Sequence, residues 1–203
     1  MCKMAKKEMG LLIIFGAVFL FSIGGLFFQG MNFFKESGIT GYAIETTVSN
    51  VTITSYLAIA MSTNLTEGIL FGDISALPAA DQNATHNYDG GSSGSTMYLN
   101  VSTDSNTGVD FCIKADTDLS TGSDILGAGN ESYSNSTSTN VTFPAVANEV
   151  ELTTGYIWAG NISVGGDIYY RFWLDVPAAT PSGTYNNTIT FKGVVANGGV
   201  GCS

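Results

Sequence analysis

The sequence predicts a mainly β protein in which a single N-terminal hydrophobic α-helix precedes an antiparallel β-sandwich. Three observations support this fold class: an apolar run near the N-terminus, later segments in which apolar and polar residues alternate, and stretches rich in Gly, Ser and Asn between those segments. Alternation with period two is typical of strands that bury one face. We expect about seven to nine strands, because no later segment has convincing amphipathic helical spacing.

The predicted helix covers residues 10–34. Gly10–Phe28 contains 19 residues and no charge, close to the ~20 apolar residues that span a bilayer. Residues 1–9 contain three lysines and are expected to be a basic cytoplasmic start, which places the N-terminus inside. The apolar run is longer than that of a signal peptide, and the best cleavage site, at residues 41–43, lies far beyond it. We therefore expect the helix to stay on the mature chain, as a transmembrane anchor or a filament core.

Residues 35–47 are expected to be a linker, and residues 48–203 an extracellular β-sandwich domain. The clearest strand is Asp167–Val176, which is followed after a Pro/Gly turn by a second alternating run, Tyr185–Phe191. These two strands either pair as a hairpin or lie in facing sheets. Four further strands are expected within residues 51–61, 96–102, 109–115 and 149–158. Two polar stretches are predicted to be long surface loops, residues 81–96 and 120–140.

Composition excludes several classes of function. The chain has 7 basic and 17 acidic residues among 203, for a net charge of −10. A surface this negative repels phosphate backbones, so nucleic-acid binding is excluded. The single histidine, His86, leaves little of the usual general-base and metal-site chemistry. We therefore expect a protein that is not an enzyme.

Sites for N-linked glycans are unusually frequent. The chain has 15 Asn, 20 Ser and 22 Thr, from which about three Asn-x-Ser/Thr sequons would arise by chance. Nine occur, all beyond the hydrophobic helix: Asn50, Asn64, Asn83, Asn100, Asn130, Asn135, Asn140, Asn161 and Asn186. A glycan must face solvent, so these positions, Asn50 and Asn161 in particular, are expected on the outside. A polar β protein that generates sequons by composition alone is the alternative.

The three cysteines have different expected locations. Cys2 lies on the cytoplasmic side of the predicted helix, whereas Cys112 and Cys202 lie outside, where disulfides persist. We predict a Cys112–Cys202 disulfide. The alternative is two buried free thiols.

Three patterns in the sequence are candidates for chemical or binding sites. Gly90–Gly94 matches the G-x-S-x-G nucleophile elbow, but it lies in a Gly/Ser loop without a following helix and is expected to be non-catalytic. Asp116, Asp118 and Asp124 place carboxylates at alternate positions, as calcium loops do, with a solvated acidic loop as the alternative. Four aromatic residues are candidates either for a carbohydrate platform or for the core: Trp158, Trp173, Tyr169 and Tyr170. No other cofactor is expected.

The layout resembles that of archaeal pilin-like and other secreted archaeal surface proteins: a short basic start, one apolar helix, and a sequon-rich β domain. The ending Trp173–Phe191, with Pro181-x-Gly183-Thr184-Tyr185 before its last strand, is also similar to Ig-like surface domains. The resemblance implies an Ig-like or jelly-roll-type sandwich, helices that bundle into a filament core, and glycosylated β domains around it. A second route to filaments is donation of a strand into the next subunit, for which Thr46–Ile59 is the candidate.

These observations predict a structural subunit of a pilus-like filament at the cell surface, N-glycosylated and self-assembling through the helix and the β domain. Its expected partners are copies of itself and, through residues 10–34, the membrane. The first alternative is a monomeric membrane-anchored adhesin or carbohydrate-binding module. The second is a surface hydrolase, for which Asp104 and Asp110 are the only acids near two predicted strand ends.

Overall fold

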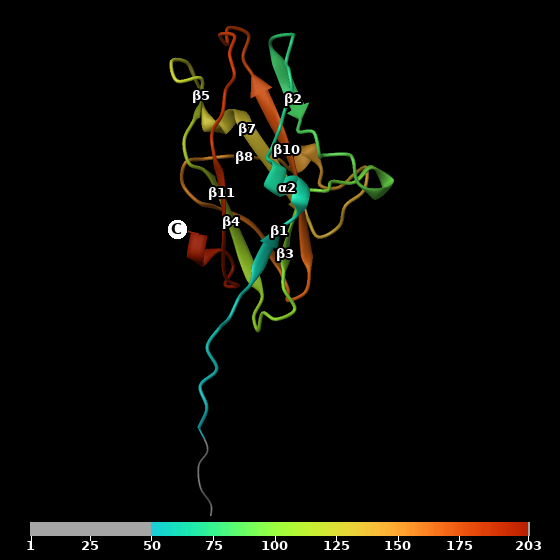
Figure 1. Ribbon diagram of the computed structural model, residues 1–203, viewed down its shortest axis with the longest axis vertical. Coiled ribbons are helices and arrows are strands. Elements are labelled where there is room, and N and C mark those ends of the chain that lie inside the picture. Colours follow the sequence, from blue (N-terminus) through green and yellow to red (C-terminus); the bar gives the residue numbers. More distant parts are fainter. Residues whose placement is uncertain (1–49, 203) are drawn as a thin grey trace, which may run out of the picture. The chain divides into compact units, whose positions relative to one another are not determined.

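A computed structural model describes residues 50–202, and this part of the chain is mainly β, with antiparallel sheets (Figure 1). The basic start (residues 1–9), the predicted helix (residues 10–34) and the linker (residues 35–47) lie outside the described residues.

The largest sheet has six strands and is organised around β10, the longest strand. Its order is β1-β3-β10-β7-β8, and β2 pairs with the upper part of β10 (Figure 1). All pairs are antiparallel. The bounds are β1 Ile59–Met61, β2 Ala79–Asn83, β3 Tyr98–Val101, β7 Glu131–Ser136, β8 Val150–Glu151 and β10 Asp167–Val176.

A three-stranded sheet has the order β11-β4-β9, with β4 (Val109–Ala115) between β11 (Ile189–Val195) and β9 (Ile157–Ile162). Strands β5 (Leu119–Ser120) and β6 (Ile125–Leu126) form a separate pair. Since β10 and β11 belong to different sheets, the two clearest predicted strands do not pair as a hairpin.

The main core draws side chains from both larger sheets. On β10, Ile168, Tyr170 and Phe172 are buried, as the alternation of the sequence predicts. From the other sheet, the alternate residues Val109, Phe111 and Ile113 of β4 join the same cluster. A strand side chain points to the face opposite that of its neighbour, so one face of each strand supplies this core.

A second, smaller cluster lies at the C-terminal end of β10. There Leu174 and Val176 pack with Leu119 and Leu126 of the β5–β6 pair.

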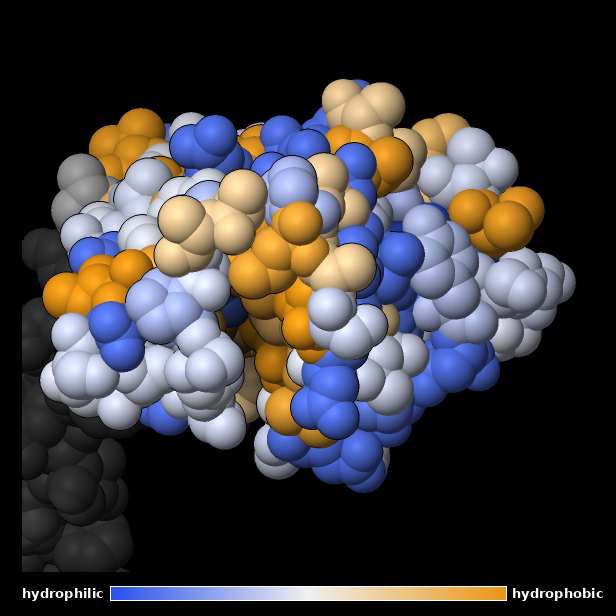
Figure 2. Space-filling model, turned by 90° about the horizontal axis from the view of Figure 1, so that it is seen from above, coloured by the Kyte–Doolittle hydropathy of each residue, from blue (hydrophilic) through white to orange (hydrophobic). Residues whose placement is uncertain are grey.

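Viewed from above, hydrophobic residues gather in a strip through the middle of the surface and hydrophilic residues surround it (Figure 2).

The prediction of a surface loop over residues 120–140 is wrong. Strand β7 lies within it, pairs with β10 along six residues, and is buried from Glu131 to Ser134. Its polar side chains have partners: Glu131 accepts a hydrogen bond from Asn187, and Ser132 donates to Glu149. The sequence pattern missed this strand because only Tyr133 of its six residues is apolar.

Two other predicted strands are shorter in the structure. Of residues 51–61 only β1 is a strand, and residues 149–158 divide between β8 and β9, which belong to different sheets. The predicted loop 81–96 begins with the last residues of β2. Helical segments within the described residues are short: α2 Thr63–Glu67, η1 Gly91–Ser93, η2 Ala128–Asn130, η3 Val146–Asn148 and η4 Val200–Cys202.

Candidate functional site

The G-x-S-x-G loop closes on itself instead of presenting a serine above a strand–helix junction. The Gly90 amide donates to the Gly94 carbonyl at 2.7 Å, and Ser92 and Ser93 have positive φ values of 55° and 59°. His86, the one histidine, contacts Asp89 at 2.5 Å and Glu67 at 3.5 Å. No hydrogen bond joins the His86 ring to Ser92 or Ser93 within the described residues.

The backbone of this loop is bound by Arg171, a side chain that is 1% exposed on the outward face of β10. Its Nε donates to the Asn87 carbonyl at 2.8 Å, and its Nη2 donates to the Ser93 carbonyl at 3.2 Å. The same guanidinium donates to the carbonyls of Pro144, at 2.6 Å, and Asn140, at 2.5 Å. One side chain therefore holds two long loops against β10.

No carboxylate within residues 50–202 forms an ion pair with Arg171. Its neighbours are the carbonyl oxygens and the Tyr88 ring, whose centre is 3.9 Å from the guanidinium carbon. Burial lowers the pKa of Arg171 from its ordinary value, and Tyr88 opposes this. Carbonyl dipoles and a ring face stabilise the charge here. The sequence alone did not suggest this role, although Arg171 is the one cation in the longest strand.

The three aspartates of the calcium hypothesis form separate contacts. Asp116 lies 2.9 Å from the Lys114 ammonium and also accepts from Thr190. Asp118 accepts the Ala128 amide at 2.8 Å, and Asp124 accepts from Ser123. Between residues 50 and 202, no group of three or more His, Cys, Asp or Glu side chains could hold a metal ion.

The four candidate aromatic residues do not form one platform. Tyr170 lies in the core and Trp173 is buried on the outward face of β10. Tyr169 is half-buried beside Tyr98, with ring centres 5.5 Å apart. Only Trp158, on β9, is largely exposed, at 51%.

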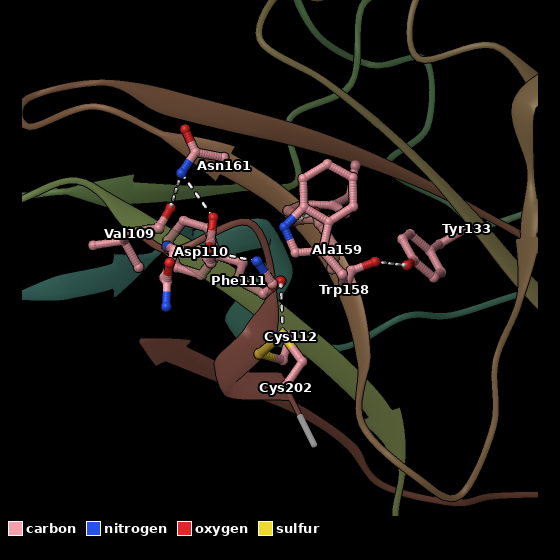
Figure 3. Close-up of a disulfide and its surroundings, with 12 residues drawn as sticks. Val109, Asp110, Phe111, Cys112, Tyr133, Trp158, Ala159, Asn161 and Cys202 are labelled. Carbon is pink, nitrogen blue, oxygen red and sulfur yellow. Dashed lines mark hydrogen bonds between the residues drawn. A yellow bond between two sulfur atoms is a disulfide. The ribbon is translucent and has the colours of Figure 1, made fainter. Parts of the chain in front are cut away.

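Two residues of β4 on either side of Phe111, Asp110 and Cys112, bind the C-terminal segment to the outward face of that strand (Figure 3). Cys112 and Cys202 lie at disulfide distance, with sulfurs 2.01 Å apart, so the predicted pairing is confirmed. Asp110 is 0% exposed and accepts hydrogen bonds from the amides of Asn197, at 2.6 Å, and Gly199, at 2.7 Å. The Asn161 amide donates to it at 2.7 Å.

These contacts give Asp110 a structural role instead of the catalytic one that the hydrolase alternative needs. Burial raises the pKa of its carboxyl, but the hydrogen bonds from Gly199, Asn197, Asn161 and Trp158 outweigh burial, and the net pKa is below the usual value. Asp104, the other candidate acid, is exposed. Asp104 is not among the groups that bond the Asp110 carboxylate.

Replacing Asp110 by asparagine is expected to lower the free energy of unfolding by about 2–3 kcal/mol at neutral pH, because charge-assisted hydrogen bonds are lost. The folded pKa lies below the unfolded value of ~3.9, so the contribution of Asp110 is complete above that pH and is lost as pH falls through the folded pKa. Chemical denaturation at several pH values should show the wild type and Asp110→Asn converging below pH ~4. Asp104→Asn is the control, with an expected change within ~0.5 kcal/mol. A gap that persists unchanged to pH 2 would contradict this role.

None of the nine sequon asparagines is buried. Asn50, Asn83, Asn161 and Asn186 are exposed, and the other five are half-buried. Asparagine nitrogens in four sequons donate hydrogen bonds inside the domain: Asn64 to Thr96, Asn100 to Asp167, Asn130 to Gly127, and Asn161 to Asp110.

One flank of the domain is open and apolar. A groove with a volume of about 270 Å³ lies between β1, the outer strand of the six-stranded sheet, and β11, the outer strand of the other sheet. Residues of three strands line it: Ile59, Ala60, Met61, Leu99, Ile189, Thr190 and Phe191. Sequence reasoning had no signal for this groove, because it depends on which strands end at the edges.

No helix within residues 50–202 is long and apolar enough to cross a membrane. The helix predicted to do so lies outside the described residues. Comparisons of this chain with protein families, with curated proteins and with solved structures find no match.

Proposed function

We propose that this protein is a structural, non-enzymatic subunit of a cell-surface filament. The observation that supports it best is the apolar groove between two strand edges, neither of which is paired by another strand of residues 50–202. Elsewhere in this domain, Arg171 and Asp110 hold loops and the C-terminal segment in place. Edges of this kind invite pairing with another chain. A surface built for self-association needs such a face, whereas a catalytic cleft needs converging polar groups.

The fold that suits this role is a β-sandwich of Ig-like or jelly-roll type. Support comes from the common core, to which alternate residues of β10 and of β4 both contribute. Antiparallel sandwiches of this kind have a polar outer surface that tolerates glycans, and their edge strands are their sites of association.

The apolar residues 10–34 would hold the subunit in the membrane before assembly or in the filament core after it, with the N-terminus inside. N-linked glycans would cover the β domain, which would lie outside the cell. Support for the glycans is the excess of sequons and the absence of any buried asparagine among them.

The test of filament formation is electron microscopy of material sheared from the cell surface, with mass spectrometry to identify this chain. We expect regular filaments that contain its peptides. Peptides from residues 11–28 in these filaments would show that the predicted hydrophobic helix is part of the polymer. Recovery of the chain only as a monomer in the membrane fraction would contradict the proposal.

Glycan occupancy is expected to differ among the sequons. Transfer requires an accessible asparagine nitrogen, and in Asn64, Asn100, Asn130 and Asn161 that nitrogen already donates hydrogen bonds within the domain. We expect higher occupancy at the other five, where no described residue accepts a bond from it: Asn50, Asn83, Asn135, Asn140 and Asn186. Glycopeptide mass spectrometry measures this directly. Full occupancy of the first four with none on the other five would contradict it.

A second candidate function is a membrane-anchored carbohydrate-binding adhesin. The observation that favours it is Trp158, which is 51% exposed on β9. Exposed aromatic faces stack on sugars. Loss of glycan binding in Trp158→Ala, with normal folding and no filaments from the wild type, would favour this function over the first.

A further inference from the structure

The groove between β1 and β11 is bordered by two strands that each have one unpaired edge. β1 pairs only with β3, and β11 pairs only with β4, among the strands that the structure describes. Backbone N–H and C=O groups on such edges are ready to bond another strand. The apolar groove lies between these two edges, and Ile189–Phe191 is the part of β11 that lines it.

A small polar ligand is a poor match for this groove. Thr190 supplies the only side-chain hydroxyl in its lining, and that hydroxyl already donates to Asp116 at 3.1 Å. The volume of about 270 Å³ is also below the ~300–1,000 Å³ of ordinary ligand pockets. An extended peptide fits better, since its backbone pairs with an edge while alternate side chains enter the apolar space.

The chain itself contains such a peptide immediately before β1. In residues 50–55, Val51 and Ile53 alternate with threonines, no residue is charged, and both apolar side chains are strongly exposed, at 83% and 78%. β-branched residues at alternate positions suit a strand with one buried face. The absence of charge also lets the segment approach an acidic domain without repulsion.

The residues that lead from Ile53 to β1 do not line the groove of their own domain. This stretch is bound in extended form to the loop after β3: Asn106 donates to the Thr54 carbonyl at 2.9 Å, and Ser105 accepts the Ala58 amide at 2.9 Å. The Tyr56 amide also donates to Asn106, at 2.8 Å. Ile53, directly before this bound stretch, keeps its side chain 78% exposed.

We propose that residues 50–55 of one copy bind as an added strand to the Ile189–Phe191 edge of a second copy, with Val51 and Ile53 in the groove. The inference rests on the proposed function and names the contact through which subunits join. β11 is the receiving edge because it has seven residues, whereas β1 has three.

The donating and receiving surfaces are different parts of the same chain. Each copy can therefore give one strand and receive one, which is a head-to-tail contact, and such contacts extend into open filaments unless a ring closes. A contact of this kind would also cover the apolar side chains that the isolated domain leaves exposed.

Cross-linking tests the contact directly. Full-length chains with Cys2→Ser carry either Ile53→Cys or Ile189→Cys, and the two are mixed and mildly oxidised. Ile189 lines the groove and packs toward the core, the side on which Ile53 is proposed to lie. We expect a mixed disulfide dimer joining residues 53 and 189, identified by peptide mass spectrometry. The control mixture replaces Ile189→Cys by Val141→Cys, since Val141 is 65% exposed and does not line the groove, and should give at least tenfold less product.

Assembly of single variants separates this proposal from the function it rests on. Ile53→Asp should leave the melting temperature of the isolated subunit unchanged and raise the concentration needed for filaments at least tenfold, while the matched Val141→Asp assembles normally. Wild-type filaments together with no 53–189 disulfide in the cysteine mixture, or filaments of Ile53→Asp at the wild-type concentration, would overturn strand donation and leave the filament function standing. Absence of wild-type polymer together with absence of that disulfide would overturn both.

Discussion

Replacing Arg171 by methionine is expected to lower the free energy of unfolding by about 3–5 kcal/mol. The methionine keeps much of the packing volume but donates no hydrogen bond, so the carbonyls of Asn87, Ser93, Asn140 and Pro144 lose their donor. Each buried carbonyl left unpaired costs ~1–3 kcal/mol, and those nearest the surface recover part of this by binding water. Urea denaturation of the folded protein measures the change.

Two variants control for charge and for general effects of mutation. Arg171→Lys keeps the charge but lacks the planar fork of donors, so it should recover only part of the loss. Lys192→Met removes a cation from a half-buried position on β11, where the ammonium lies over the Tyr156 ring, and should cost ~1 kcal/mol or less.

Arg171→Met should also loosen two particular loops. Amide hydrogen exchange is expected to rise in residues 87–95 and 139–145, which Arg171 holds, more than in β4 or β11. A uniform increase over the whole domain, or an unchanged unfolding midpoint, would show that these loops keep their places without the guanidinium.

Removing the disulfide by Cys112→Ser with Cys202→Ser is expected to cost about 4–5 kcal/mol. The two cysteines are 90 residues apart in sequence, and the bond restricts the unfolded chain by closing that long loop. Asp110 binds the same C-terminal segment through Asn197 and Gly199. The segment is therefore expected to stay partly attached in the folded variant. Any part that detaches regains conformational entropy in the folded state and lowers the measured loss below the loop-entropy figure.

Reduction of the wild type with dithiothreitol is the control and should give the same unfolding midpoint as the double variant. Because the disulfide and Asp110 hold one segment, their effects should not add: combining Asp110→Asn with the double serine variant should cost less than the sum of the two. Two alkylatable thiols at positions 112 and 202 in unreduced protein, with an unchanged midpoint after dithiothreitol, would contradict the bond.

The contacts of Gly199 give the C-terminal segment a second constraint. A Cβ at this position would lie 2.7 Å from the Trp158 ring, and φ is +79°. Glycine therefore lets the chain pass over Trp158 and direct its amide to Asp110. The exposure of Trp158 on the outside of β9 is thus limited on one side by the C-terminus.

Several features followed from the amino-acid sequence alone. The alternation of apolar and polar residues in Asp167–Val176 and Val109–Ala115 identified the two central strands and the faces that supply the core. Successive side chains of a strand point to opposite faces, so a strand with one face on the core has an apolar residue at every second position. Cys112 and Cys202 could be paired by elimination, since only these two were expected on the same side of the membrane.

Tertiary structure decided what local pattern could not. The sequence of β7 predicts a polar loop. In the structure it is a strand, because Asn187 and Glu149, from distant parts of the chain, form hydrogen bonds with its buried polar side chains. The alternation of β10 predicts that Arg171 is an outward-facing, exposed cation. In the structure it is buried, because two loops remote in sequence place their carbonyl groups around it. The partner that satisfies a buried polar group is a property of the folded chain, and no local window contains it.

The open flank is the clearest case. The alternation of Val51, Ile53, Leu57 and Ile59 predicted one strand, and only its last part is β1. Whether a strand pairs on both sides depends on the order of strands in the sheet, which is set by contacts between distant segments. The sequence by itself determined a segment with the apolar alternation of a strand. The tertiary structure decided that the first residues of this segment are exposed and that an apolar groove lies between two strand edges.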